Sequence, residues 1–89
     1  MASWEIIARG RVQGVGFRWF VQNCALRFNI KGYVKNQPDG TVLIIATGTP
    51  EDLVDFSETV KQGNRFAQVN QLTINELAQY REYDDFFIA

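Results

Sequence analysis

The residues best suited to chemistry in this chain lie in one stretch, residues 10–18, with the sequence GRVQGVGFR. Its three glycines allow successive backbone N–H groups to converge on one point, because glycine adopts backbone angles that other residues avoid. A helix beginning directly after the glycines would add the partial positive charge of its N-terminus, and Arg18 would add a planar fork of donors. These groups predict a cradle for a phosphate-sized anion. An ordinary strand-to-helix turn with a solvated arginine is the alternative that the stretch alone leaves open.

Other reactive side chains are few. The chain has no histidine, a single cysteine at position 24, and no Asp or Glu residues clustered at metal-ligand spacing. The sequence therefore indicates no catalytic triad, zinc site or two-metal site. Cys24 is expected to be a small core residue and not a nucleophile, because no histidine is present to activate it.

Catalysis by this chain would therefore rest on positioning and electrostatics, which suits phosphoryl transfer. An acyl phosphate suits it best. Its leaving group is the conjugate base of an acid with a pKa of about 4, so its departure needs no general acid.

Asn36 is the second candidate site residue, because its side-chain amide could hold a water molecule for in-line attack on phosphorus. The alternative is a turn-forming asparagine that bonds to its own backbone ahead of Pro38. Gln13 and Arg11 could also reach a ligand, although solvated side chains are favoured for both.

Length and composition limit the number of domains, the location and the disulfides that the chain can have. The chain of 89 residues, 46% apolar and 21% charged, has room for one folded domain, expected over residues 1–89. It has no run of eighteen apolar residues, and its start, MASWEII, lacks the basic and apolar regions of a signal peptide, so a cytoplasmic location is expected. With one cysteine, an intramolecular disulfide is ruled out.

Charge is distributed unevenly along the chain. Residues 1–35 contain six basic side chains and one acidic side chain, a net charge of +5, whereas residues 36–89 carry a net charge of −6. Positive charge gathered around the glycine stretch favours a small anion over a long polyanion, which would need a broad basic face. Scattered solvated charges are the other interpretation.

The spacing of apolar residues predicts the elements that would position these groups. An apolar stripe predicts a helix over residues 17–28, capped by Asn29 in a left-handed conformation. A second helix should begin at Pro50, with Thr49 as its N-cap, and end at Gly63. Strands are expected over residues 3–11, 30–35, 41–47, 68–77, with a bulge or irregular register, and 86–88.

The resulting order is β-α-β-β-α-β with a short terminal strand. It predicts an α+β ferredoxin-like sandwich, in which a four-stranded antiparallel sheet, plus the short C-terminal strand, carries both helices on one face. In this topology the third strand lies beside the first. The hairpin of the second and third strands would therefore bring Asn36 towards the glycine stretch.

Two segments resemble the signatures of the acylphosphatase family. They are Gly10-x-Val12-Gln13-Gly14-Val15-x-Phe17-Arg18 and Gly32-Tyr33-Val34-Lys35-Asn36-x-x-x-Gly40-x-Val42, the latter continuing to Gly48. The resemblance implies a small, metal-independent cytosolic enzyme that hydrolyses carboxyl-phosphate bonds without a cofactor.

By matching position, the resemblance assigns roles to individual residues. Arg18 and the backbone N–H groups of Gln13, Gly14, Val15, Gly16 and Phe17 would bind the phosphoryl group, and Asn36 would orient the attacking water. The expected partner is a small-molecule acyl phosphate, with phosphate or sulfate as inhibitory anions. We expect a monomer that binds no nucleic acid and no membrane.

Three positions depart from the family pattern. Ala8 replaces a larger β-branched residue and should affect packing, and Ala89 replaces a basic end and should affect stability. Gln37 follows Asn36 where some members have threonine, which could alter how firmly Asn36 is held.

Two alternatives remain at this stage. RNA-recognition motifs share the βαββαβ order, and Lys31-Gly32-Tyr33-Val34 begins like their aromatic motif. However, Lys35 and Asn36 follow where stacking aromatic residues belong, and the outer face of the sheet is expected to lack an aromatic pair. The other alternative, a domain of a larger carbamoyl-transfer protein, is disfavoured by a chain that runs from Met1 to Ala89.

Overall fold

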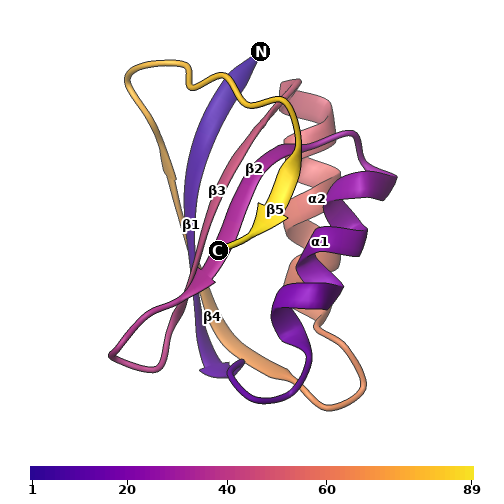
Figure 1. The fold of residues 1–89 in the computed structure, drawn as a ribbon, viewed down its shortest axis with the longest axis vertical. Coiled ribbons are helices and arrows are strands. Elements are labelled where there is room, and N and C mark those ends of the chain that lie inside the picture. The colour runs from indigo at the N-terminus through magenta and orange to yellow at the C-terminus, as the bar shows by residue number, and fades with distance from the viewer.

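The computed structural model describes all of residues 1–89 as a five-stranded sheet with two helices (Figure 1). The strands are β1 (Ala2–Arg11), β2 (Lys31–Asn36), β3 (Val42–Gly48), β4 (Gln68–Glu76) and β5 (Phe86–Ile88). The helices are α1 (Phe17–Arg27) and α2 (Pro50–Gln62). The elements follow the predicted order, with differences of one residue at several ends.

The strands lie in the order β4-β1-β3-β2-β5. The four longer strands are antiparallel, and β3 pairs with β1 on one side and with β2 on the other. Strand β5 runs parallel to β2, so the five-stranded sheet is mixed. Both helices cover the same face of the sheet (Figure 1), which confirms the predicted ferredoxin-like sandwich.

The core lies between the helices and this face of the sheet. Alternate strand residues such as Ile6, Val34 and Ile44 point into it and are fully buried. Helix α1 contributes its predicted stripe, with Phe17, Val21, Cys24 and Ala25 buried and Phe20 and Phe28 partly buried.

The predicted helix caps are confirmed. Thr49 Oγ1 accepts a hydrogen bond of 3.1 Å from the Asp52 N–H at the start of α2, and Gly63 ends this helix with a φ of 72°. Asn29, just after α1, has the left-handed φ of 58°. The predicted irregularity in β4 is a bulge, because Arg9 pairs with Gln71 while Gly10 pairs with Val69.

The prediction that the outer face of the sheet lacks an aromatic pair is wrong. Tyr33 stacks on Phe87 with ring centroids 5.6 Å apart, and Tyr83 contacts Tyr33 edge-on at 6.0 Å. Phe87 reaches this face because β5 pairs with β2 in a register that places it opposite Tyr33. Tyr83 comes from the segment that connects β4 to β5, so the cluster packs this segment against the sheet.

Two buried hydroxyl groups also hold the segment that connects β4 to β5. Ser3 and Thr47 share a hydrogen bond of 2.7 Å, and Thr47 Oγ1 also donates to the Arg81 carbonyl at 2.8 Å. The path of this segment delivers β5, and with it Ile88, to the side of the sheet next to α1.

Neither helix is long and apolar enough to cross a membrane.

Candidate active site

The glycine loop (residues 12–16) connects the end of β1 to the start of α1. Val12 is buried, whereas Gly14 and Gly16 both have a φ of +73°, a left-handed conformation that other residues adopt at a cost. Gly16 is the N-cap of α1 and has no side chain with which to cap the helix. The N–H groups of the first helical turn have no intrahelical acceptor, so they are available to an anion.

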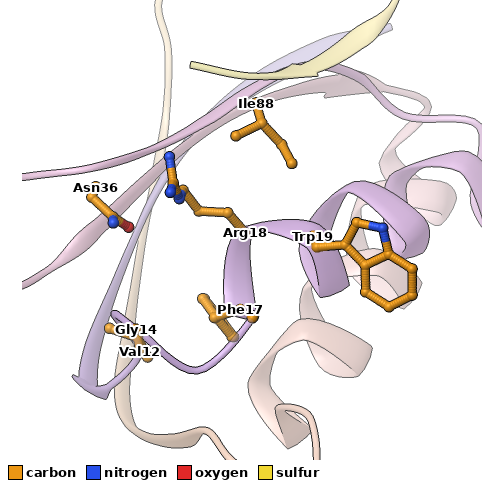
Figure 2. Close-up of a pocket in the computed structure, with 8 residues that line it drawn as sticks. Val12, Gly14, Phe17, Arg18, Trp19, Asn36 and Ile88 are labelled. Atoms are coloured by element: carbon orange, nitrogen blue, oxygen red, sulfur yellow. The ribbon is translucent and has the colours of Figure 1, made fainter.

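A cavity of about 190 Å³ opens beside this loop. Its volume suits a small ligand, since sites for drug-sized molecules are larger. Figure 2 shows the side chains around it, which come from the glycine loop, the first turn of α1, the end of β2 and β5. The lining residues are Val12, Gly14, Gly16, Phe17, Arg18, Trp19, Asn36 and Ile88.

Arg18 is the cation of this cavity. Its Nη1 donates a hydrogen bond of 3.2 Å to the Ala89 carbonyl oxygen, directly after β5. A guanidinium has five N–H donors, so this contact leaves others for a ligand. The side chain is half-buried and its end points towards the Asn36 amide (Figure 2). The Ala89 carbonyl is therefore one contact that orients Arg18.

Asn36 is the last residue of β2 and pairs with Val42 across the hairpin. Strand alternation places it on the same face as Val34, the face that carries the helices. Its Oδ1 atom is buried and has no hydrogen-bond partner within the protein. The alternative that Asn36 bonds to its own backbone in the turn is therefore wrong for this oxygen.

The turn after Asn36 is fixed by Thr41 and Asp39. The Thr41 hydroxyl lies 2.6 Å from Asp39 Oδ1 and 2.9 Å from Gln37 Oε1, and the Thr41 N–H donates to Asp39 Oδ1. The hydrogen bonds from the Thr41 side chain and backbone lower the pKa of Asp39. Gln37, the departure from the family pattern, thus contributes its side chain to the turn that follows Asn36.

The expectation of a solvated Gln13 side chain is wrong. Gln13 Nε2 donates to the Gln37 and Thr41 carbonyl oxygens, both at 2.8 Å. These contacts use both amide hydrogens, so the side chain ties the glycine loop to the hairpin that carries Asn36. Its position follows from the β1–β3 pairing, which brings the loop and the hairpin turn to the same end of the sheet (Figure 1).

Cys24 lies in the core and does not line the cavity. Burial raises the pKa of its thiol, while the nearby positive charge of Arg27 lowers it. A buried, protonated thiol is a poor nucleophile, in agreement with its expected role as a core residue. No three His, Cys, Asp or Glu side chains lie together in a group that could hold a metal ion.

The cavity brings together most of the residues that the sequence nominated. Arg18, Asn36, Gly14, Gly16 and Phe17 all line it, whereas Gln13 and Val15 do not. Val12, Trp19 and Ile88 line it but were not nominated as site residues. Ile88 was detectable in principle, because alternation from Phe86 places it on the helix-bearing face, whereas nothing in the sequence pattern distinguished Trp19 as a wall of the cavity.

Fold and cavity together define a class of protein: a small ferredoxin-like sandwich with a cavity that is lined by glycines, an arginine and an asparagine. The family model described as Acylphosphatase matches residues 4–88 of the chain. An acylphosphatase from Bacillus velezensis is 46% identical over 89 residues, an alignment that covers 100% of this chain and 99% of that protein.

Solved structures agree with the sequence match. The crystal structure of acylphosphatase from Bacillus subtilis has a TM-score of 0.97 and 42% identity, covering 100% of this chain and 99% of that one. An acylphosphatase structure from Coxiella burnetii has a TM-score of 0.93 and 28% identity, covering 99% of this chain and 92% of that one.

This chain belongs to the acylphosphatase family. The matches support acylphosphatase activity, with a small-molecule acyl phosphate as the substrate class that the family implies. They do not favour the RNA-binding alternative.

Proposed function

We propose that the cavity binds the phosphoryl group of an acyl phosphate and that a water molecule oriented by Asn36 attacks the phosphorus in line. The water oxygen forms the new P–O bond, and the bond from phosphorus to the carboxylate oxygen breaks. Its electron pair leaves with the carboxylate, and the water protons pass to the phosphate product or to solvent. No side chain has to protonate the leaving group, because a carboxylate is stable at neutral pH.

In this proposal, binding rests on the glycine loop and Arg18. The backbone N–H groups of residues 13–17 and the guanidinium of Arg18 would donate to the phosphoryl oxygens. These donors are fixed before substrate arrives, since the glycines and α1 set the backbone and the Ala89 carbonyl holds the arginine. Preorganised donors stabilise the charge that spreads over the equatorial oxygens in the transition state.

The buried, unpartnered Oδ1 of Asn36 is the observation that carries the proposal. A buried carbonyl oxygen without a donor costs about 1–3 kcal/mol, so it favours a bound donor at this point. Water is the donor that a small polar cavity accommodates. Since Arg18 lines the same cavity, a water molecule on Asn36 would lie beside the bound phosphoryl group.

Several further features belong to the same proposal. The reaction uses no metal ion and no cofactor, inorganic phosphate and sulfate compete with the substrate, and the active form is a monomer. Residues 1–89 act as one domain in the cytoplasm. The family resemblance supports these features.

Steady-state hydrolysis of benzoyl phosphate by the purified chain tests the proposal. We expect turnover that EDTA does not reduce and that phosphate and sulfate inhibit competitively, because all the donors belong to the protein. Circular dichroism provides the control for folding. Folded protein without turnover would overturn the proposal, and activity that EDTA abolishes would overturn its metal-independent form.

A further inference from the structure

Asn64 lies in the connection between α2 and β4, outside both signature segments, and contacts the glycine loop. Its Nδ2 donates a hydrogen bond of 2.9 Å to the Val15 carbonyl oxygen. A Cβ atom placed on Gly16 would lie 3.7 Å from the same nitrogen, so Asn64 adjoins the Val15–Gly16 peptide. The two residues are joined across 49 positions of sequence.

The oxygen of the Asn64 amide is also hydrogen-bonded. Its Oδ1 accepts hydrogen bonds from the Ala67 N–H at 2.7 Å and the Phe66 N–H at 3.2 Å. Two N–H donors on one end and a carbonyl on the other define which amide atom is oxygen and which is nitrogen. Asn64 therefore presents its donor to Val15 from a fixed position.

The bond to Val15 has a consequence for the opposite side of the peptide. In a trans peptide the C=O and the following N–H point in opposite directions. With the Val15 carbonyl turned towards Asn64, the Gly16 N–H is turned away from it. Gly16 lines the cavity, and its N–H is one of the donors assigned to the phosphoryl group.

We propose that Asn64 is a positioning residue that presets the Val15–Gly16 peptide for phosphoryl binding. The inference rests on the proposed function of the glycine loop. A peptide next to glycine rotates readily, because glycine allows more backbone conformations than any other residue. Without the Asn64 donor, a bound anion would have to order this peptide itself, which weakens binding.

Two variants separate the donor of Asn64 from its other contacts. Asn64→Asp keeps an acceptor for the Phe66 and Ala67 N–H groups but has no N–H donor. Asn64→Ser is uncharged, and its hydroxyl is one bond too short to replace the contact with Val15. Phe66→Ala is the matched control, since this side chain lies in the same connection and is 66% exposed.

The measurement is the dissociation constant of inorganic phosphate by calorimetry, with KM and kcat for benzoyl phosphate and a melting curve for each variant. In both Asn64 variants we expect phosphate affinity to fall about three- to tenfold, the effect of one hydrogen bond, with KM rising by a similar factor and kcat changing less than twofold. In Phe66→Ala these values should match the unaltered chain.

Two results would overturn the inference while leaving the proposed function intact. One is unchanged phosphate affinity in folded Asn64→Ser, since a loss confined to Asn64→Asp would be an effect of charge. The other is an equal loss in Phe66→Ala. If the unaltered chain neither binds phosphate nor hydrolyses benzoyl phosphate, the proposed function fails and this inference fails with it.

Discussion

Arg18 contributes charge to the cavity, and Asn36 contributes a neutral amide whose oxygen has no protein partner. The two side chains are suited to different tasks. A guanidinium donates hydrogen bonds to anionic oxygens, whereas an amide oxygen accepts one and can direct one hydrogen of a water molecule. The glycines provide a third component, which is a set of backbone N–H donors. Their left-handed conformations, which a side chain would disfavour, orient these donors.

Gly14→Ala tests the glycine component, with Gly40→Ala as its control. Both glycines have positive φ values, +73° and +91°, and an added Cβ would meet nothing within 4 Å at either position. Each variant should therefore lose a similar stability, about 1–2 kcal/mol, from strain alone. Phosphate affinity should fall in Gly14→Ala and stay unchanged in Gly40→Ala, measured by competitive inhibition. Equal phosphate affinity in the two variants would contradict the role of the loop.

At the scale of elements, the site depends on contacts between the glycine loop and the β2–β3 turn. Gln13 donates to two carbonyl oxygens of that turn, and Thr41 orders the turn internally. Strand pairing places the two segments at the same end of the sheet, but the side-chain bonds fix their separation. Gln13 contacts neither Arg18 nor Asn36, yet its hydrogen bonds help to set the distance between them.

Gln13→Ala should therefore change both stability and catalysis. Two hydrogen bonds would be lost, for a decrease of about 1–3 kcal/mol in the free energy of unfolding, while the Gln37 and Thr41 carbonyl oxygens would each keep a backbone N–H donor. Misalignment of the hairpin should also lower kcat for benzoyl phosphate. Urea unfolding and steady-state kinetics measure the two effects, and Gln71→Ala, an exposed position on β4, is the control. Normal stability and kcat in Gln13→Ala would show that the hydrogen bonds from Gln13 to the β2–β3 turn have no role.

At the scale of the whole molecule, the fold brings residues from both ends of the chain to one cavity. Phe86 connects the C-terminal strand to the core, where its ring lies edge-on to Phe56 of α2 at 6.2 Å. Two and three residues later, Ile88 lines the cavity and the Ala89 carbonyl holds Arg18. Packing of the core and position of the arginine are therefore linked through β5.

Phe86→Ala tests this link. Removal of a ring that is 5% exposed should destabilise the protein by about 3–5 kcal/mol. The loss should be accompanied by weaker phosphate binding at temperatures where the variant is still folded, because β5 no longer holds its register. Phe87→Ala, on the outer face and 46% exposed, is the matched variant and should bind phosphate normally. Equal phosphate affinity in both variants would contradict the link.

How much of this arrangement was predictable from the sequence varies with scale. Apolar periodicity and turn residues gave the elements, and the order of the elements placed the hairpin beside β1, so Arg18 and Asn36 could be nominated together. The contacts of Gln13, Asn64 and Tyr83 were not predictable. Each of these residues lies in a loop, and its contacts depend on the path of that loop, which short-range sequence patterns do not determine.

The division of work between Arg18 and Asn36 is the central claim, and one comparison of two variants tests it most directly. Phosphate dissociation constants and kcat for benzoyl phosphate are measured for Arg18→Ala and Asn36→Ala. We predict that Arg18→Ala weakens phosphate binding about 30-fold or more, the effect of losing charge-assisted hydrogen bonds. Asn36→Ala should bind phosphate normally while its kcat falls about 100-fold or more. Full turnover by folded Asn36→Ala would contradict the account.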